Sequence, residues 1–266
     1  MEQPKIQNPK PKTNMVFIHG AGSNADFWHE QRRAFPGAHY LDLPGHMSRS
    51  GKDPGRTVER PKTHTPTSGY PKSKIEEYAD YVAGYIEQNK LDAVILNGHS
   101  MGGAITQTLA LRRPAWLQAI VLTGTGARLR VLPQLLQLLR EDYPAAVDLI
   151  IQESFALPEG ELTYAQKARI NGTRRQILRT PQEVTLADYE ACDHFDVMGR
   201  VDQITVPTLC VVGALDRMTP PKYSEYLHSR IRGASLEIIE DAGHMLPLER
   251  AGEYNECLSS WLRVSA

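Results

Sequence analysis

The chain has 266 residues, of which 41% are hydrophobic and 23% charged, a balance typical of a globular protein with a sizeable core. Its formal net charge is −1, so no global field attracts nucleic acid or an anionic membrane. No apolar run approaches the roughly 18 residues needed to span a bilayer. The first residues lack the apolar segment of a secretory signal. Three widely spaced cysteines indicate free thiols rather than a disulfide framework, and we expect a cytoplasmic protein.

Short apolar runs alternate with helical patterns along the chain. Apolar residues recur along one face of a helix between 75 and 88, and further helices are expected over 104–113, 223–230 and 254–262. Largely apolar runs of this kind are typical of parallel strands that are buried on both faces. The pattern predicts an α/β fold with a mostly parallel central sheet of about six strands and helices on both faces. Its ligand site should lie at the carboxyl ends of the strands. The expected strands are 15–20, 39–45, 93–98, 119–126, 208–214 and 235–243.

Two segments interrupt this alternation. Residues 47–74 are rich in proline and glycine and contain seven Lys or Arg against two acids. This basic loop is either a solvated surface loop or a mobile rim that favours anionic substrate groups. Residues 128–201 separate two strands by far more than a crossover needs, and we expect them to form a helical lid. The lid would be inserted into a core made of residues 1–127 and 202–266.

The stretch Gly98-His99-Ser100-Met101-Gly102 lies between an expected strand and an expected helix. A nucleophile at such a turn needs a sharp bend, and the residues two before and two after it approach closely, which favours glycine at both. The following helix offers the free N–H of Met101 to a developing oxyanion. We therefore expect Ser100 to be a nucleophile, although the five-residue pattern alone would also fit a plain turn.

A second oxyanion donor is expected from His19-Gly20-Ala21-Gly22, which follows the first strand. Glycines at this point allow the backbone to turn an N–H toward the nucleophile. Ala21 is the best candidate, and the alternative is a glycine turn that only connects two elements.

A serine nucleophile also needs a base, and the base needs an acid that holds its tautomer. His244 follows the last strand, at the end of the sheet where a site would form. Asp216 ends the strand before it, whereas the rival Asp241 lies in the same short turn as His244 and is poorly placed to reach the ring. We therefore expect a triad of Ser100, Asp216 and His244. His46 could rim the pocket but has no evident role.

These motifs together resemble the α/β-hydrolase superfamily, and within it the small serine carboxylesterases, the monoacylglycerol lipases and the acyl-carrier methyl esterases. The resemblance implies a serine nucleophile, a covalent acyl-enzyme and no cofactor. The matching residues cover nearly the whole chain in the family's order: His19-Gly20-Ala21-Gly22, Asp42-Leu43-Pro44-Gly45-His46, Gly98-His99-Ser100-Met101-Gly102-Gly103, Val206-Pro207, Gly213-Ala214-Leu215-Asp216 and Gly243-His244.

The expected function is hydrolysis of carboxylic esters of small molecules. The leucine-rich segment 129–139 suggests an apolar pocket for short to medium acyl chains, and the alternative is that these leucines only pack the lid against the core. A thioesterase, a C–C bond hydrolase or another acyl transfer on the same triad is the main alternative, and a non-catalytic receptor of the same fold is a weaker one. The histidines and acids show no metal-ligand spacing, so we expect no metal. Only the basic loop would favour nucleic acid, and it has no interleaved aromatic residues, so we expect no nucleic-acid partner. The oligomeric state cannot be read from the sequence.

Overall fold

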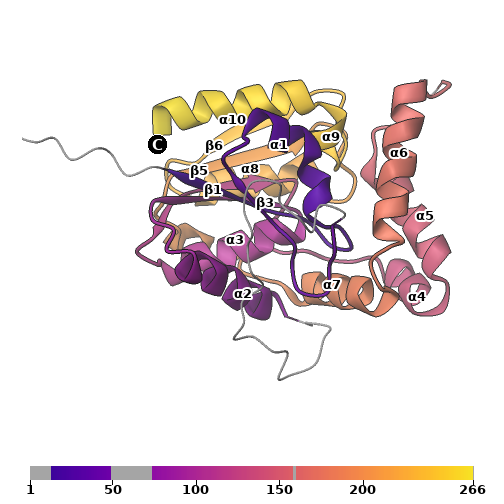
Figure 1. Ribbon diagram of the computed structural model, residues 1–266, viewed down its shortest axis with the longest axis horizontal. Helices are drawn as coiled ribbons and strands as arrows, with labels where there is room; N and C mark the ends of the chain where they lie inside the picture. The colour runs from indigo at the N-terminus through magenta and orange to yellow at the C-terminus, as the bar shows by residue number, and fades with distance from the viewer. Residues whose placement is uncertain (1–12, 49–73, 158–159, 266) are drawn as a thin grey trace, which may run out of the picture.

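The computed structural model describes residues 13–48, 74–157 and 160–265, and the ribbon in Figure 1 shows how its elements are arranged. One sheet of six parallel strands has the order β2-β1-β3-β4-β5-β6. The expected number and direction of the strands are confirmed, with ends that differ by up to four residues. The strands are β1 (Asn14–Ile18), β2 (His39–Leu41), β3 (Val94–His99), β4 (Leu117–Thr123), β5 (Thr208–Gly213) and β6 (Ser235–Ile239).

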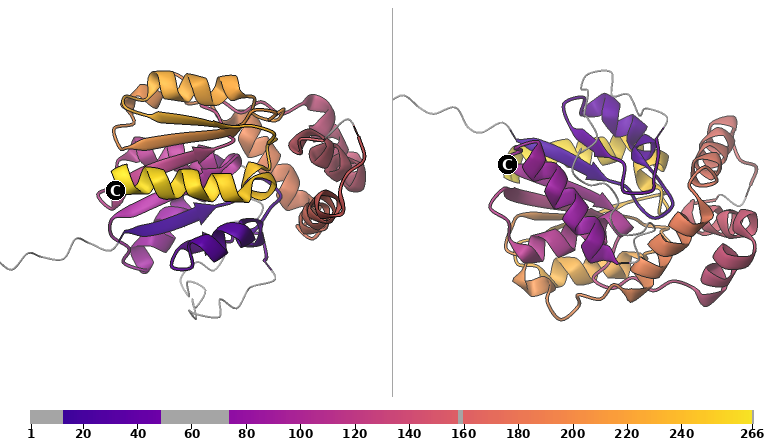
Figure 2. Two further views of the ribbon diagram at one scale, coloured as in Figure 1. Left: turned by 90° about the horizontal axis from the view of Figure 1, so that it is seen from above. Right: turned by 60° about the horizontal axis from the view of Figure 1, so that its bottom comes forward.

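Helices cover both faces of the sheet (Figure 2). The helices packed on one face are α2 (Ile75–Gln88), α3 (Met101–Arg112) and α8 (Pro221–Arg230). The elements packed on the other are the 3-10 turn η1 (Ala25–Trp28), α1 (His29–Ala34), α9 (Leu246–Glu249) and α10 (Ala251–Ser265). A second short 3-10 turn, η2 (Val201–Gln203), precedes β5.

The two-residue period of each strand divides the core into two apolar clusters. In β1, Val16 and Ile18 pack with α2 and α3, while Met15 and Phe17 pack with η1 and α10. Successive side chains point to opposite faces of a strand, so a strand covered on both sides must be apolar throughout. That requirement explains the continuous apolar runs in the sequence.

Four helices lie between β4 and β5 in the chain, namely α4 (Pro133–Glu141), α5 (Tyr143–Ser154), α6 (Tyr164–Ile177) and α7 (Gln182–His194). They stand at the carboxyl ends of the strands, on the right of Figure 1. We refer to them as the covering helices. All four lie within the segment 128–201 that was expected to be helical, although the sequence analysis did not predict the individual helices.

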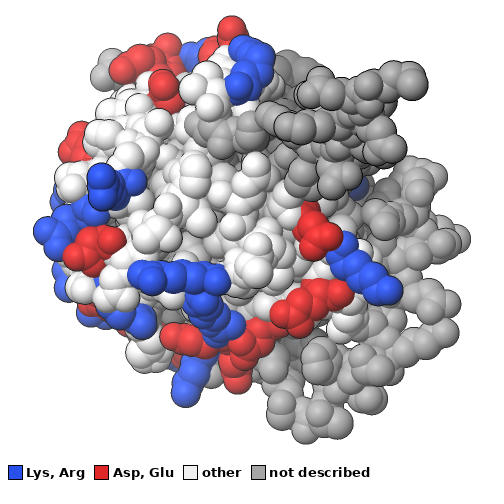
Figure 3. Space-filling model, turned by 90° about the vertical axis from the view of Figure 1, so that its left-hand side faces the viewer, with Lys and Arg blue, Asp and Glu red and all other residues white. Residues whose placement is uncertain are grey.

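The opposite side of the molecule has mixed charges (Figure 3). On the described part of that face, positive and negative side chains are interspersed around an uncharged centre, in keeping with the small net charge of the chain. The basic loop predicted at 47–74 lies almost entirely outside the described residues. None of the described helices is long and apolar enough to cross a bilayer.

Candidate active site

Ser100 is the residue between the last position of β3 and the first position of α3. Its φ of 54° and ψ of −116° lie outside the favoured regions for a residue with a side chain, and such a conformation costs on the order of 1–3 kcal/mol. Backbone contacts hold it there. The N–H of Ser100 donates to the Thr123 carbonyl at 2.9 Å, and its own carbonyl accepts the N–H of Gly103 at 2.8 Å and the Thr125 hydroxyl at 2.9 Å.

The glycines two residues before and after Ser100 are required by close backbone approaches. A Cβ on Gly98 would lie 2.1 Å from the Gly102 carbonyl oxygen, and one on Gly102 would lie 2.3 Å from the Ile18 carbonyl oxygen. Nothing but backbone fits in these spaces. The backbone of the Ser100 turn therefore packs directly against itself and against the neighbouring strand β1.

The two expected oxyanion donors flank this turn. Residues 20–23, which we call the oxyanion turn, form a tight turn in which the Ser23 N–H donates to the Gly20 carbonyl at 3.3 Å. A Cβ on Gly20 would lie 3.1 Å from the Ser100 Cβ, so the turn packs directly against the nucleophile. Within the described parts of the chain, neither the Ala21 N–H nor the Met101 N–H has a hydrogen-bond partner.

His244 lies in the loop that follows β6 and is hydrogen-bonded through Nδ1 to Asp216 Oδ2 at 2.9 Å. A carboxylate only accepts, so Nδ1 carries the proton and Nε2 is left with a lone pair. Asp216 follows β5, the strand next to β6, and both side chains are almost fully buried. Burial alone would raise the pKa of Asp216, but His244 and hydrogen bonds from Thr219 outweigh it and hold the pKa below its usual value.

Thr219 is a member of this site that the sequence analysis missed. Its N–H donates to Asp216 Oδ1 at 2.8 Å and its hydroxyl donates to Oδ2 at 2.9 Å. The rival acid, Asp241, does not reach the ring: its exposed side chain bonds to Arg250 at 3.0 Å. The spacing Asp-x-x-Thr is the signal that predicts a side chain capped by the N–H three residues later.

Two further histidines shape the site without charge. His99 donates from Nε2 to the His244 carbonyl at 2.9 Å, and His19 Nε2 accepts the Leu43 N–H at 3.1 Å. Burial, together with the neighbouring His244 and His46 rings respectively, lowers the pKa of each to about 3. Both rings are therefore neutral at physiological pH, which suits a structural role.

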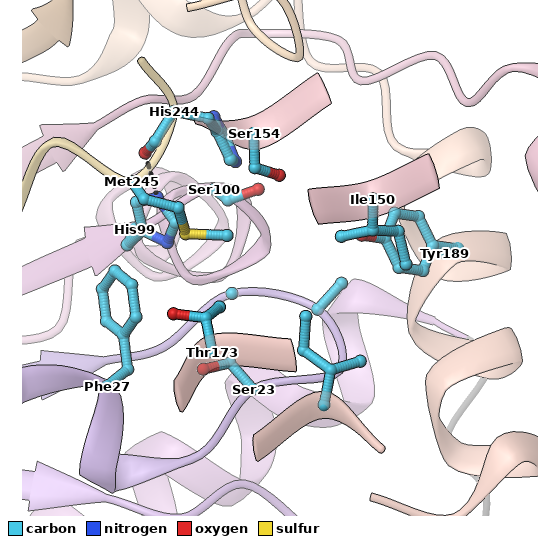
Figure 4. A pocket seen from close by; sticks show the side chains of 13 residues that line it. Ser23, Phe27, His99, Ser100, Ile150, Ser154, Thr173, Tyr189, His244 and Met245 are labelled. Carbon is cyan, nitrogen blue, oxygen red and sulfur yellow. Dashed lines mark hydrogen bonds between the residues drawn. The ribbon is translucent and has the colours of Figure 1, made fainter. Parts of the chain in front are cut away.

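Ser100 and His244 line one small cavity beneath the covering helices (Figure 4). Its volume of about 20 Å³ holds little more than one water molecule. The covering helices contribute Ile150, Ile177 and Tyr189 to its wall. The leucines of 129–139, which were expected to form an acyl pocket, do not line it, because Leu135 and Leu139 pack into the apolar core instead.

A hydroxyl group inside the cavity has no protein partner among the described residues. Ser154 is fully buried at the end of α5, its Oγ is unbonded, and it lies near Ser100 (Figure 4). Leaving a buried hydroxyl unpaired costs about 1–3 kcal/mol. No sequence signal marked this residue, since a serine at a helix end is common.

A larger groove of about 850 Å³ runs beside the cavity, between α6 and the η1–α1 segment. Thr173 lines both spaces, so the groove adjoins the cavity. Two arginines of α6, Arg169 and Arg175, line the groove together with Arg179, which follows α6, and with the acids Asp26 and Glu30. Among the described residues of the chain, no cluster of His, Cys, Asp and Glu could hold a metal ion.

Comparison with known proteins places this geometry in a family. The chain is 28% identical to the pimeloyl-[acyl-carrier protein] methyl ester esterase of Neisseria meningitidis serogroup A, over 91% of this chain and 74% of that protein. The structure is similar to that of a thermophilic esterase, with 32% identity, a TM-score of 0.75 and coverage of 94% and 89% of the two chains. An esterase from Exiguobacterium antarcticum shares the fold at 20% identity, with a TM-score of 0.79 and coverage of 95% and 92%.

The model of the alpha/beta hydrolase family matches residues 15–256, which is most of the chain. The match includes every residue of the proposed site and both layers of helices. The predicted fold is therefore confirmed, and the chain belongs to the alpha/beta hydrolase family.

Proposed function

We propose that this protein hydrolyses carboxylic esters through an acyl-enzyme on Ser100. The observation that carries the proposal is the arrangement at the carboxyl ends of the strands. A strained serine at a strand-to-helix turn shares a cavity with a histidine whose far nitrogen is bonded to a buried carboxylate. The relatives named as esterases support the same reaction class.

In the first half-reaction, Ser100 Oγ attacks the ester carbonyl carbon while Nε2 of His244 takes the serine proton. The tetrahedral oxyanion accepts hydrogen bonds from the N–H groups of Ala21 and Met101, the two donors that are otherwise unpaired. Asp216 stabilises the imidazolium that forms. The C–O bond to the leaving alcohol then breaks, and His244 returns the proton to that oxygen.

In the second half-reaction, His244 takes a proton from water, and the resulting hydroxide attacks the acyl carbon. Ser100 leaves with the proton from His244, and the carboxylic acid is released. No Ser100–His244 hydrogen bond is formed within the described part of the chain, which fits a free enzyme whose contact tightens when substrate binds.

The substrate proposed here is a short or medium acyl ester that carries a polar or anionic group. The apolar wall formed by Ile150, Ile177 and Tyr189 suits an acyl chain, and the unpaired Ser154 hydroxyl suits a hydrogen-bonding group beside the scissile bond. Arg169, Arg175 and Arg179 outnumber Asp26 and Glu30 in the adjoining groove and give it an excess of positive charge. The cavity is too small for an ester at about 20 Å³, so the covering helices must shift as substrate enters, as expected of a lid.

The test is hydrolysis of p-nitrophenyl esters from acetate to palmitate by the wild-type protein and by Ser100→Ala. We expect an optimum at short or medium chains and a loss of at least about 10³-fold in kcat in the variant. Equal turnover by the two proteins would refute the role of Ser100. A thioester series measured in parallel distinguishes the esterase from a thioesterase on the same residues.

A further inference from the structure

A buried cluster next to the oxyanion turn has no part in the reaction described above. Its centre is Asp188 on α7, whose side chain is completely buried. The carboxylate accepts three hydrogen bonds, from the Gly22 N–H at 2.8 Å, from His46 Nε2 at 2.8 Å and from the Tyr78 hydroxyl at 2.5 Å. The cluster therefore joins a covering helix to α2, to the loop after β2 and to the oxyanion turn.

The charge of His46 follows from the hydrogen-bond partners of its two ring nitrogens. His46 Nδ1 lies 3.0 Å from the Pro44 carbonyl oxygen, and Nε2 lies 2.8 Å from the Asp188 carboxylate. Both partners can only accept, so both ring nitrogens must donate, and His46 is an imidazolium paired with a carboxylate. Burial alone would lower the pKa of His46, but Asp188 and the backbone carbonyls outweigh it and raise the pKa above its ordinary value.

Side chains from α7 and from the loop between α6 and α7 bind both the N–H and the carbonyl group of Gly22 in the oxyanion turn. Asp188 binds the Gly22 N–H, and the Thr180 hydroxyl donates to the Gly22 carbonyl at 3.0 Å. Gly22 has a φ of +66°, and a Cβ on it would lie 3.0 Å from the Thr185 side chain of α7. The turn is fixed less by its own backbone, whose one internal bond is 3.3 Å long, than by these groups.

We infer that Asp188, held in place by His46, is a positioning residue that fixes the oxyanion turn so that the Ala21 N–H points at the reacting carbonyl. The covering helices would then contribute to catalysis as well as to substrate entry. A shift of α7 would move the oxyanion donor with it. The expected effect on the rate rests on the proposed esterase function, whereas the inference that Asp188 holds the oxyanion turn in place does not.

The test uses Asp188→Asn and the milder Tyr78→Phe, which removes one of the three donors to the carboxylate. Tyr254→Phe is the matched control, because it also deletes a buried hydroxyl, one that bonds to Asn97 and Thr123 away from the oxyanion turn. Each protein is assayed for kcat and KM on p-nitrophenyl butyrate. Two further readouts are the inhibition constant of a trifluoromethyl ketone, which forms an oxyanion on the serine, and backbone amide exchange of residues 19–24.

For Asp188→Asn we expect a fall of about 10²-fold in kcat, comparable to the loss of one oxyanion donor, with KM changed less than about twofold. The ketone should bind more weakly in proportion, amide exchange at 19–24 should speed up, and Tyr78→Phe should show smaller changes in the same direction. Tyr254→Phe should lose melting temperature without these effects.

The inference is overturned if Asp188→Asn, or Tyr78→Phe should the first variant not fold, matches Tyr254→Phe in kcat, ketone affinity and amide exchange. If the wild-type protein cleaves no ester, the proposed function fails. Amide exchange alone then tests whether Asp188 holds the oxyanion turn in place. Faster exchange at 19–24 in the Asp188 or Tyr78 variant would then support it, and unchanged exchange would refute it.

Discussion

The Ser100 turn and the covering helices meet at the same cavity but are held by different kinds of contact. The turn is held by backbone against backbone, as the 2.1 Å approach expected at Gly98 shows. The helices α6 and α7 contact the core through side chains, such as Asp188 to the Gly22 N–H and Gln176 Nε2 to Asn24 Oδ1 at 2.6 Å, whereas the end of α5 also makes a backbone bond, from the Met245 N–H to the Ser154 carbonyl. Side-chain bonds are exchanged more readily than a close backbone approach is relieved, so we expect any movement on substrate entry to come from the covering helices rather than from the Ser100 turn.

The largest expected effect is that of Gly98→Ala in the turn. The new methyl group would meet the Gly102 carbonyl, and backbone cannot yield as a flexible side chain would. We expect a loss of at least about 3 kcal/mol in the free energy of unfolding, or no folded protein. Urea unfolding measures it, with Gly37→Ala as the control, since nothing lies within 4 Å of a Cβ there. Equal stability of the two variants would mean that the backbone of the turn can move to make room for a methyl group.

Asp216→Asn tests the acid that faces His244. Thr219 can still donate to the amide oxygen, so the fold should survive, while the ring loses the partner that holds its tautomer. We expect kcat to fall by about 10²–10⁴-fold with KM little changed. The matched control is Asp241→Asn, whose exposed side chain bonds to Arg250. A larger loss of kcat in the Asp241 variant would assign the role to that residue instead.

Acid should destabilise the core around the site through His19 and His99. Both are neutral when folded, with pKa values lowered to about 3, so the unfolded chain binds more protons below its ordinary pKa of about 6.5. Stability is therefore lost as pH falls from about 6.5 toward 3, by about 2 kcal/mol for each ring at pH 5.

The titration of His46 does not change the stability further between about pH 6.5 and pH 3. Its pKa is raised, so its contribution is already complete below about pH 6.5 and is lost only as pH rises through the folded value. Asp216, with its lowered pKa, contributes above the ordinary carboxyl range and is lost at lower pH. Urea midpoints at pH 7 and pH 5 measure the change, and a His99→Gln variant should reduce it. Midpoints that do not move would show that the two rings are not held neutral.

The smallest expected effect is that of Gly172→Ala in α6. Nothing lies within 4 Å of a Cβ at this position, and alanine is favoured over glycine inside a helix by about 0.5–1 kcal/mol. We expect a gain of that size in the free energy of unfolding, measured by urea unfolding. A loss of stability would indicate that α6 is packed as tightly as the Ser100 turn, which would remove the difference between the two regions.

The two regions also differ in how well the sequence predicts them. Ser100, Asp216 and His244 each follow a strand, and parallel strands end at one edge of a sheet, so local patterns were enough to bring them together. Gly98 is equally local, because its close approach to Gly102 lies within one turn, whereas Gly102 also approaches the Ile18 carbonyl of β1, which is distant in the chain.

The covering helices were harder to predict because their contacts are distant in the chain. Asp188 and His46 are separated by 142 residues, and no periodicity links them. Helix α6 is largely polar, so it has no apolar periodicity, and the local signal for its start is the capping box between Thr163 and Gln166. The pocket wall came from α5, α6 and α7 rather than from the leucine-rich segment, because an apolar residue can face the core as well as a cavity.

The central claim is that Ser100 carries the acyl group, and covalent labelling tests it most directly. The wild-type protein would be reacted with a fluorophosphonate, and the modified residue would be mapped by peptide mass spectrometry while ester hydrolysis is followed. The account predicts one adduct per chain, on Ser100, with hydrolysis lost in step with labelling. Hydrolysis that persists in fully labelled protein, or is lost with the adduct on another residue, would contradict it.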